Sequence, residues 1–242
     1  MQKADMKKEE QDLLPYYVII SRTSTALAGI IRLFTGYGFN HASISLDEQP
    51  ARIYSFARYN YHSPLAGGFI EESAERFDFK TKKPSLAKVY RLYATSDEIR
   101  KMRAILDRMS SNPDEYVYDS FGALGLRFLG NDHCFTCVGF VAHMMKASGY
   151  LPQEKAHYSI RRLDRMLENE LFFSGFTKDF AGACQTADQA YFERKDTKEV
   201  FSDSFKRFAR LFRFYRLYKT KRLKNGSAAT ESIYAIQDKS EE

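Results

Sequence analysis

The sequence predicts an α+β fold in which a small antiparallel sheet packs on a helix that carries a cysteine. Two observations lead to this prediction: short segments with strand character cluster before residue 95, and segments with helical spacing dominate after it. Strands and helices that are segregated along a chain are typical of the α+β class. With 242 residues, 44% of them hydrophobic, the chain can also bury a sizeable core.

Several strands are expected in the first part of the chain. The segment 41–46 (HASISL) alternates polar and apolar residues, which indicates a half-buried strand, and 52–57 is expected to pair with it as a hairpin. The expected strands are 16–21, 41–46, 52–57, 69–73 after the Gly67–Gly68 turn, and 88–93.

Helices are expected where apolar residues recur every three or four positions. The strongest example is 136–148, where Phe140, Val141, Met144 and Met145 form one stripe. The segment 175–200 shows no clear pattern. The expected helices are 25–34, 96–109, 121–129, 136–148, 160–171 and 202–224.

We therefore expect one principal domain with appendages. It spans residues 15–172 and follows a flexible N-terminus at 1–14. A helical C-terminal extension occupies 173–224, and a disordered tail follows at 225–242.

The net charge of +6 is concentrated near the C-terminus. Residues 204–224 hold nine Lys and Arg and no acidic residue, so the rest of the chain is close to neutral. No apolar run is long enough to span a bilayer, and the charged N-terminus has no signal-peptide pattern. Three cysteines, an odd number, do not match a disulfide framework. We expect a cytoplasmic protein with free thiols and no cofactor.

Cys137 is the candidate nucleophile. It lies at the start of the 136–148 helix, where unpaired backbone N–H groups and the helix dipole favour a negatively charged sulfur. The same amides are placed to bind an oxyanion. Considered alone, a cysteine at this position is more often a small buried hydrophobe than a nucleophile.

Among the five histidines, His41 is the best candidate for the base. It opens a predicted strand and shares its face with Ser43 and Ser45, so its surroundings are small and polar. A third group normally orients a catalytic imidazole. Ser55, on the neighbouring strand, is the residue expected to lie across from His41, and Glu72 is the second candidate.

Two stretches resemble a known family. They are IIRLFTGYGFNHASISLDEQPARIYSFARYNYHSPLAGGFIEES, residues 30–73, and HCFTCVGFVAHMM, residues 133–145. Together they resemble the permuted NlpC-type papain-like cysteine hydrolases of the YiiX-like group. In that group the histidine strand precedes the cysteine helix, as His41 precedes Cys137 here.

The resemblance implies a circularly permuted papain-like fold over roughly residues 16–150. It implies that Cys137 is the nucleophile and His41 the base, and it aligns Ser55 with the third, polar residue. We expect Tyr54, Gly68 and Glu72, which the motifs include, to contribute to substrate binding. Val138 and Gly139 depart from the Ser and polar residue that usually follow the family's cysteine.

Cys134 and Cys137 also form a Cys-x-x-Cys pair, which is compatible with a redox pair or half of a zinc site. No second such pair exists, and His133 and His143 do not complete a known spacing. We therefore expect no metal ion, with Cys134 a buried neighbour of the nucleophile and Cys184 structural.

The basic helix 202–224 has three interpretations. In the first, its aromatic side packs on the domain and leaves a solvated basic face. In the second, it binds an anionic membrane surface by combining apolar insertion with attraction to lipid. Nucleic-acid binding is not expected, because no nucleic-acid motif accompanies the charges.

The expected function is a thiol hydrolase of the amidase, peptidase or acyl-transfer type, acting on an amide, ester or thioester of a peptide or lipid-linked substrate. The alternatives are a catalytically silent binding module on the same fold and a peripheral membrane protein.

Overall fold

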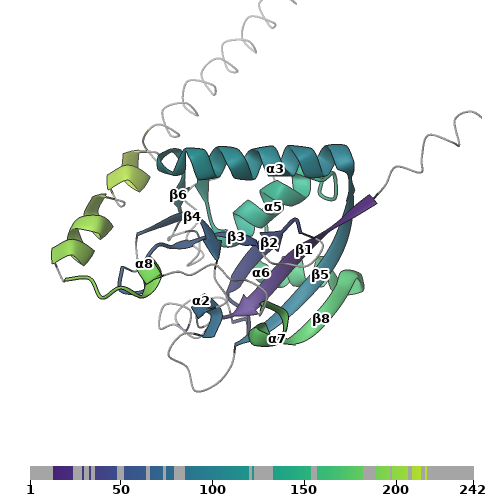
Figure 1. Ribbon diagram of the computed structural model, residues 1–242, viewed down its shortest axis with the longest axis horizontal. Coiled ribbons are helices and arrows are strands. Elements are labelled where there is room, and N and C mark those ends of the chain that lie inside the picture. Colours follow the sequence, from purple (N-terminus) through teal and green to yellow (C-terminus); the bar gives the residue numbers. More distant parts are fainter. Residues whose placement is uncertain are drawn as a thin grey trace, which may run out of the picture.

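A computed structural model describes most of the chain between residues 13 and 216 (Figure 1). The described residues are 13–23, 29, 33, 36–47, 52–63, 66–72, 75–78, 85–119, 122, 133–153, 157–181, 189–196, 198–206, 209–213 and 216.

One twisted antiparallel sheet organises the fold. Its strand order is β4-β3-β2-β1-β5-β8, so β1 lies near the centre and pairs with β2 on one side and β5 on the other. The strands are β1 (Leu13–Arg22), β2 (His41–Ser45), β3 (Ile53–Arg58), β4 (Gly67–Glu72), β5 (Leu86–Thr95) and β8 (Leu171–Phe176).

Helices follow the strands in the second half of the chain. The helices are α2 (Glu75–Asp78), α3 (Ser96–Ser111), α5 (Cys137–Ala147), α6 (Ile160–Met166), α7 (Thr177–Ala181) and α8 (Gln189–Phe192), with 3-10 turns at Pro113–Glu115 and Glu168–Glu170. Two short strands, β6 (Val117–Tyr118) and β7 (Cys134–Phe135), pair in parallel and lead into α5.

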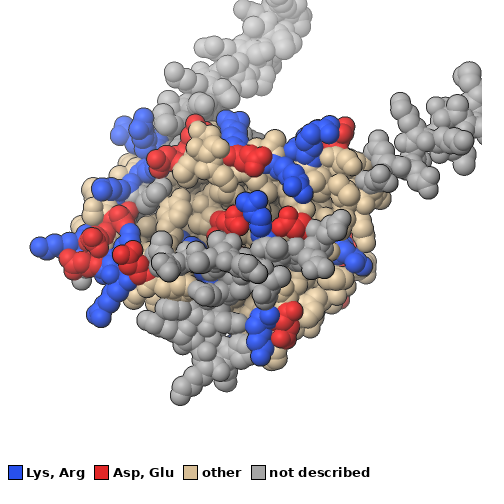
Figure 2. Space-filling model, in the orientation of Figure 1, with Lys and Arg blue, Asp and Glu red and all other residues tan. Residues whose placement is uncertain are grey.

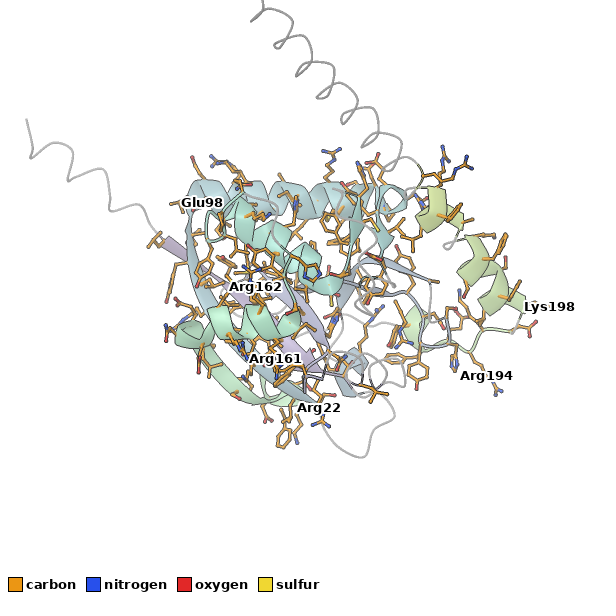
Figure 3. The ribbon with its side chains drawn as sticks, turned by 180° about the vertical axis from the view of Figure 1, so that it is seen from behind. Arg22, Glu98, Arg161, Arg162, Arg194 and Lys198 are labelled. Atoms are coloured by element: carbon orange, nitrogen blue, oxygen red, sulfur yellow. The ribbon has the colours of Figure 1, made fainter. Side chains whose placement is uncertain are left out.

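The two faces of the sheet bury cores of different size. The larger core lies on one face and takes in side chains of α3, α5 and α6, with Phe56, Phe140 and Met144 fully buried. The smaller core, on the opposite face, includes Phe77 of α2 and is flanked by Phe180 of α7. Seen from behind, α5 and α6 lie in front of the sheet (Figure 3).

The model confirms the predicted α+β class, its antiparallel sheet and several of its helices. The strand pair 41–46 and 52–57 is present as β2 and β3, and α3 begins where expected because Thr95 and Glu98 form a reciprocal capping box. On the face shown in Figure 2, Lys and Arg side chains are interspersed with Asp and Glu.

Strand β8 corrects two expectations. The helix predicted over 160–171 ends at Met166, and after a 3-10 turn Leu171–Phe176 pairs with β5 at the edge of the sheet. Strands therefore do not end before residue 95. The sheet also extends across the domain boundary that we expected at residue 172.

The C-terminal segment is helical earlier than predicted, over residues 198–206, and again over 209–213. Several expectations fall wholly or mostly outside the described residues. They are the helices 25–34 and 121–129, the flexible N-terminus, Cys184, the tail 225–242 and the end of the helix 202–224.

A buried carboxylate ties α6 to the sheet. Asp164 accepts hydrogen bonds from the hydroxyls of Tyr37 and Tyr90, and Lys88 Nζ lies 3.0 Å from both of its oxygens. Tyr37 belongs to the loop that precedes β2, so the Asp164 carboxylate also holds the loop that leads to His41. These donors outweigh the effect of burial and lower the pKa of Asp164.

Replacing Asp164 with alanine is expected to destabilise the protein by about 3 kcal/mol, because two phenols and an ammonium lose their shared acceptor. Urea denaturation measures the change. The matched control is Asp97→Ala, whose ion pair with Arg100 is on the surface and should change stability by less than about 1 kcal/mol. Equal effects of the two substitutions would contradict the structural role of Asp164.

Candidate active site

The amino end of α5 presents Cys137. Strand β7 ends at Phe135, and the next residue, Thr136, caps the helix: Thr136 Oγ1 accepts a hydrogen bond from the Gly139 amide at 2.9 Å. Cys137 is the first residue of the helix and is 5% exposed. Its sulfur therefore lies at the positive end of the helix dipole. Gly139 suits this cap, because a Cβ there would lie 3.1 Å from Thr136 Oγ1.

His41 contacts both Cys137 and Glu72. It is the first residue of β2 and is buried, and α5 packs across β2 and β3. Its Nε2 lies 2.5 Å from Glu72 Oε1, and the Cys137 side chain lies close enough to the ring to raise the pKa of His41. The order of contacts is Cys137, His41, Glu72.

Glu72 ends β4 and is 3% exposed. In addition to the imidazole it accepts two hydroxyl hydrogen bonds, from Ser43 to Oε2 and from Ser55 to Oε1, both at 2.7 Å. A buried carboxylate is costly unless hydrogen bonds and an opposite charge surround it, and these three partners supply both.

His41 and Glu72 each stabilise the charged form of the other. Burial alone would lower the pKa of His41, but the Glu72 carboxylate and the Cys137 side chain raise it from 6.5 to about 10. Burial alone would raise the pKa of Glu72, but His41 and the two serine hydroxyls lower it. At neutral pH His41 is therefore an imidazolium and Glu72 a carboxylate.

The structure brings together most of the residues proposed from the sequence. Cys137 and His41 meet, and Ser55 lies beside them, but its hydroxyl donates to Glu72. The group that contacts the imidazole is the Glu72 carboxylate, which we had assigned primarily to substrate binding and only secondarily to orienting His41.

Tyr54 and Gly68, the other two expected substrate-binding residues, have structural contacts. The Tyr54 ring stacks on Phe69 at 5.8 Å between centroids and belongs to the larger core. Gly68 gives room to Tyr59, because a Cβ at residue 68 would lie 2.0 Å from the Tyr59 hydroxyl oxygen. No described contact links either residue to Cys137.

Three nearby residues were not singled out as site residues. Ser43, already noted as a polar neighbour of His41, helps to hold Glu72. Tyr118 of β6 is buried, and its pKa is raised by burial and by the charge of Cys137. Ser21 stands opposite His41 in β1, and its buried Oγ has no hydrogen-bond partner among the described residues. Only Ser43 had a signal in the sequence, the polar alternation of its strand.

Cys134 differs from Cys137 in its surroundings. Both thiols are free and buried, but Cys134 packs with Val117 and Leu211, and burial raises its pKa. Its thiol therefore stays protonated. Among the described residues, no group of three or more His, Cys, Asp or Glu side chains is placed to hold a metal ion.

Comparisons with protein-family models, with curated proteins and with solved structures give no match to this chain. In the part of the chain that the structure describes, no helix has the length and apolarity needed to cross a bilayer.

Proposed function

We propose that this protein is a thiol hydrolase or acyltransferase with Cys137 as nucleophile, His41 as proton donor and acceptor, and Glu72 as the group that orients and charges His41. The observation that carries the proposal is the continuous contact Cys137–His41–Glu72 at the amino end of α5. A cysteine, a histidine and a third group in this order are the parts of nucleophilic acyl transfer.

The first half of the reaction forms an acyl-enzyme. The amino end of α5 and the imidazolium of His41 both favour a negative Cys137 sulfur. That sulfur attacks the carbonyl carbon of an amide, ester or thioester, and the Cys137 backbone amide is placed to stabilise the oxyanion. His41 then gives its proton to the leaving nitrogen, oxygen or sulfur as the bond breaks.

The second half regenerates the site. His41, now neutral, takes a proton from water, and the resulting hydroxide attacks the thioester carbon of the acyl-enzyme. The carboxylic acid product leaves, and the imidazolium and thiolate are restored. The Glu72 carboxylate stabilises the imidazolium at the start and end of the cycle through its negative charge. Ser43 and Ser55 hold that carboxylate in place.

The arrangement also supports a circularly permuted papain-like fold. The histidine lies on a strand of the sheet early in the chain, and the cysteine opens a later helix that packs across that sheet. The free thiols among the described residues are consistent with the reducing, cytoplasmic setting that we propose. The substrates that we propose are peptide or lipid-linked acyl compounds.

Trapping the acyl-enzyme tests this proposal. Wild-type protein incubated with a reactive acyl thioester should gain the mass of one acyl group, and peptide mapping should place that group on Cys137. The Cys137→Ala variant should gain none, and the matched variant Cys134→Ala should behave like wild type. Absence of an adduct on folded wild-type protein would favour the silent binding module instead.

A further inference from the structure

Residues 198–216, which we call the aromatic-basic segment, expose three large apolar side chains. Phe201, Phe205 and Phe212 are 73%, 64% and 53% exposed. Phe201 and Phe205 lie four residues apart in the helical stretch 198–206, which places them on one side of it. Phe212 lies in the second helical stretch, 209–213. An exposed apolar ridge of this kind marks an interaction surface.

The aromatic-basic segment is attached to the domain by other side chains. Leu211 is 8% exposed and packs with Val117 and Cys134. Arg210 adds an ion pair to Asp114 at 2.9 Å. Phe201, Phe205 and Phe212 nevertheless stay more than half exposed, which the interpretation in which the aromatic side packs on the domain does not explain.

Basic side chains flank the phenylalanines. Lys198, Lys206, Arg213 and Arg216 are exposed, and Lys198 projects away from the domain at its outer edge (Figure 3). Two acidic residues also lie in the segment: Asp203 forms an ion pair with Lys195 at 2.5 Å, and the exposed Glu199 accepts a hydrogen bond from the Asp196 amide. From residue 204 to 224 the sequence has nine basic residues and no acidic one. The exposed surface therefore combines an apolar ridge with positive charge.

We propose that the aromatic-basic segment binds an anionic membrane surface, with Phe201, Phe205 and Phe212 inserted at the boundary between headgroups and acyl chains. Apolar insertion and attraction to acidic headgroups are the two contributions that hold interfacial helices. A single-stranded nucleic acid would use the charges and could stack its bases on the aromatic rings, but no nucleic-acid-binding motif accompanies the segment, so nucleic-acid binding is an outcome that the test below distinguishes. The contact is independent of the chemistry at Cys137.

Vesicle co-sedimentation of the full chain tests this proposal. Wild type should bind vesicles of phosphatidylcholine and phosphatidylserine at least 10-fold more tightly than vesicles of phosphatidylcholine alone, and added salt should weaken the binding. The triple variant Phe201→Ser, Phe205→Ser, Phe212→Ser should lose at least 10-fold in affinity for the anionic vesicles. Thermal denaturation checks that each variant is folded.

The matched control changes Phe172 and Phe176 to serine. These residues of β8 are 49% and 42% exposed but lie outside the aromatic-basic segment, so binding should be unchanged. Equal losses of vesicle affinity in both variants would overturn the proposal, as would wild-type protein that does not bind anionic vesicles. So would binding that a single-stranded oligonucleotide displaces and that the triple substitution leaves intact, since this outcome indicates a nucleic-acid surface. Acyl-enzyme formation in solution should be the same in all variants.

Discussion

Replacing His41 with alanine is expected to slow the alkylation of Cys137 by iodoacetamide about 10- to 100-fold near pH 6.5. The reactive species is the thiolate, and an ordinary cysteine is only about 1% ionised at that pH. In the proposed mechanism the imidazolium of His41 stabilises the negative sulfur, and the charge of the ring persists because the pKa of His41 is raised to about 10. Removing the ring removes that charge and leaves only the helix terminus.

Peptide mapping by mass spectrometry measures the rate at each cysteine. The background variant Cys134→Ser removes the neighbouring thiol, which burial keeps protonated. His157→Ala is the matched control, because this histidine is exposed. Its rate should equal that of wild type. Equal rates in the His41 and His157 variants would show that the imidazole does not assist the sulfur.

Replacing Glu72 with alanine is expected to destabilise the protein by about 3–5 kcal/mol. The substitution leaves a buried imidazolium without its counter-ion and two serine hydroxyls without their acceptor. Glu72→Gln keeps the shape of the side chain and should cost less. Chemical denaturation near neutral pH measures both changes.

Glu71→Ala is the matched control, one residue earlier on the same strand. Glu71 pairs with Arg52 at the protein surface and should contribute less than about 1 kcal/mol. A Glu72 variant as stable as the Glu71 variant would rule out the buried ion pair as a feature of the folded protein.

The same pair predicts how stability depends on pH. The pKa of His41 is raised in the folded state, so its contribution is complete below about 6.5 and is lost as the pH rises through about 10. The pKa of Glu72 is lowered, so its contribution is present above the usual carboxylate range and is lost as the pH falls. Wild type should therefore be most stable between the usual carboxylate range and about pH 10. In Glu72→Ala, both the loss of stability at low pH and the loss near pH 10 should disappear.

Local patterns predicted five of the six strands of the sheet but missed β8, one of its two edge strands. The alternation of residues 41–46 reflects a strand with one polar and one apolar side, and it became β2. Strand β8 was missed because its sequence, LFFSGF, has no period-two pattern and directly follows apolar residues with helical spacing. As an edge strand, it owes its conformation to pairing with β5, which single-sequence patterns do not report.

The candidate site was only partly predictable for a similar reason. Cys137 and His41 each lie at the start of an element, which is a local signal. The imidazole contacts Glu72 rather than Ser55 for two reasons, the pairing of β2, β3 and β4 and the length of the side chain. The long Glu72 side chain reaches across the sheet to both serines and the ring. Tyr118 had no signal, because it is one of 16 tyrosines and its position comes from the pairing of β6 with β7.

Nitrogen-15 NMR of the histidine side chains tests the central claim most directly, since it reports the protonation state of each ring. We predict that the His41 imidazole carries protons on both nitrogens at neutral pH and titrates only near pH 10, where its pKa has been moved by Glu72 and Cys137. A His41 ring that instead loses its proton near pH 6.5, like an isolated histidine, would contradict the proposed ion pair and the mechanism built on it.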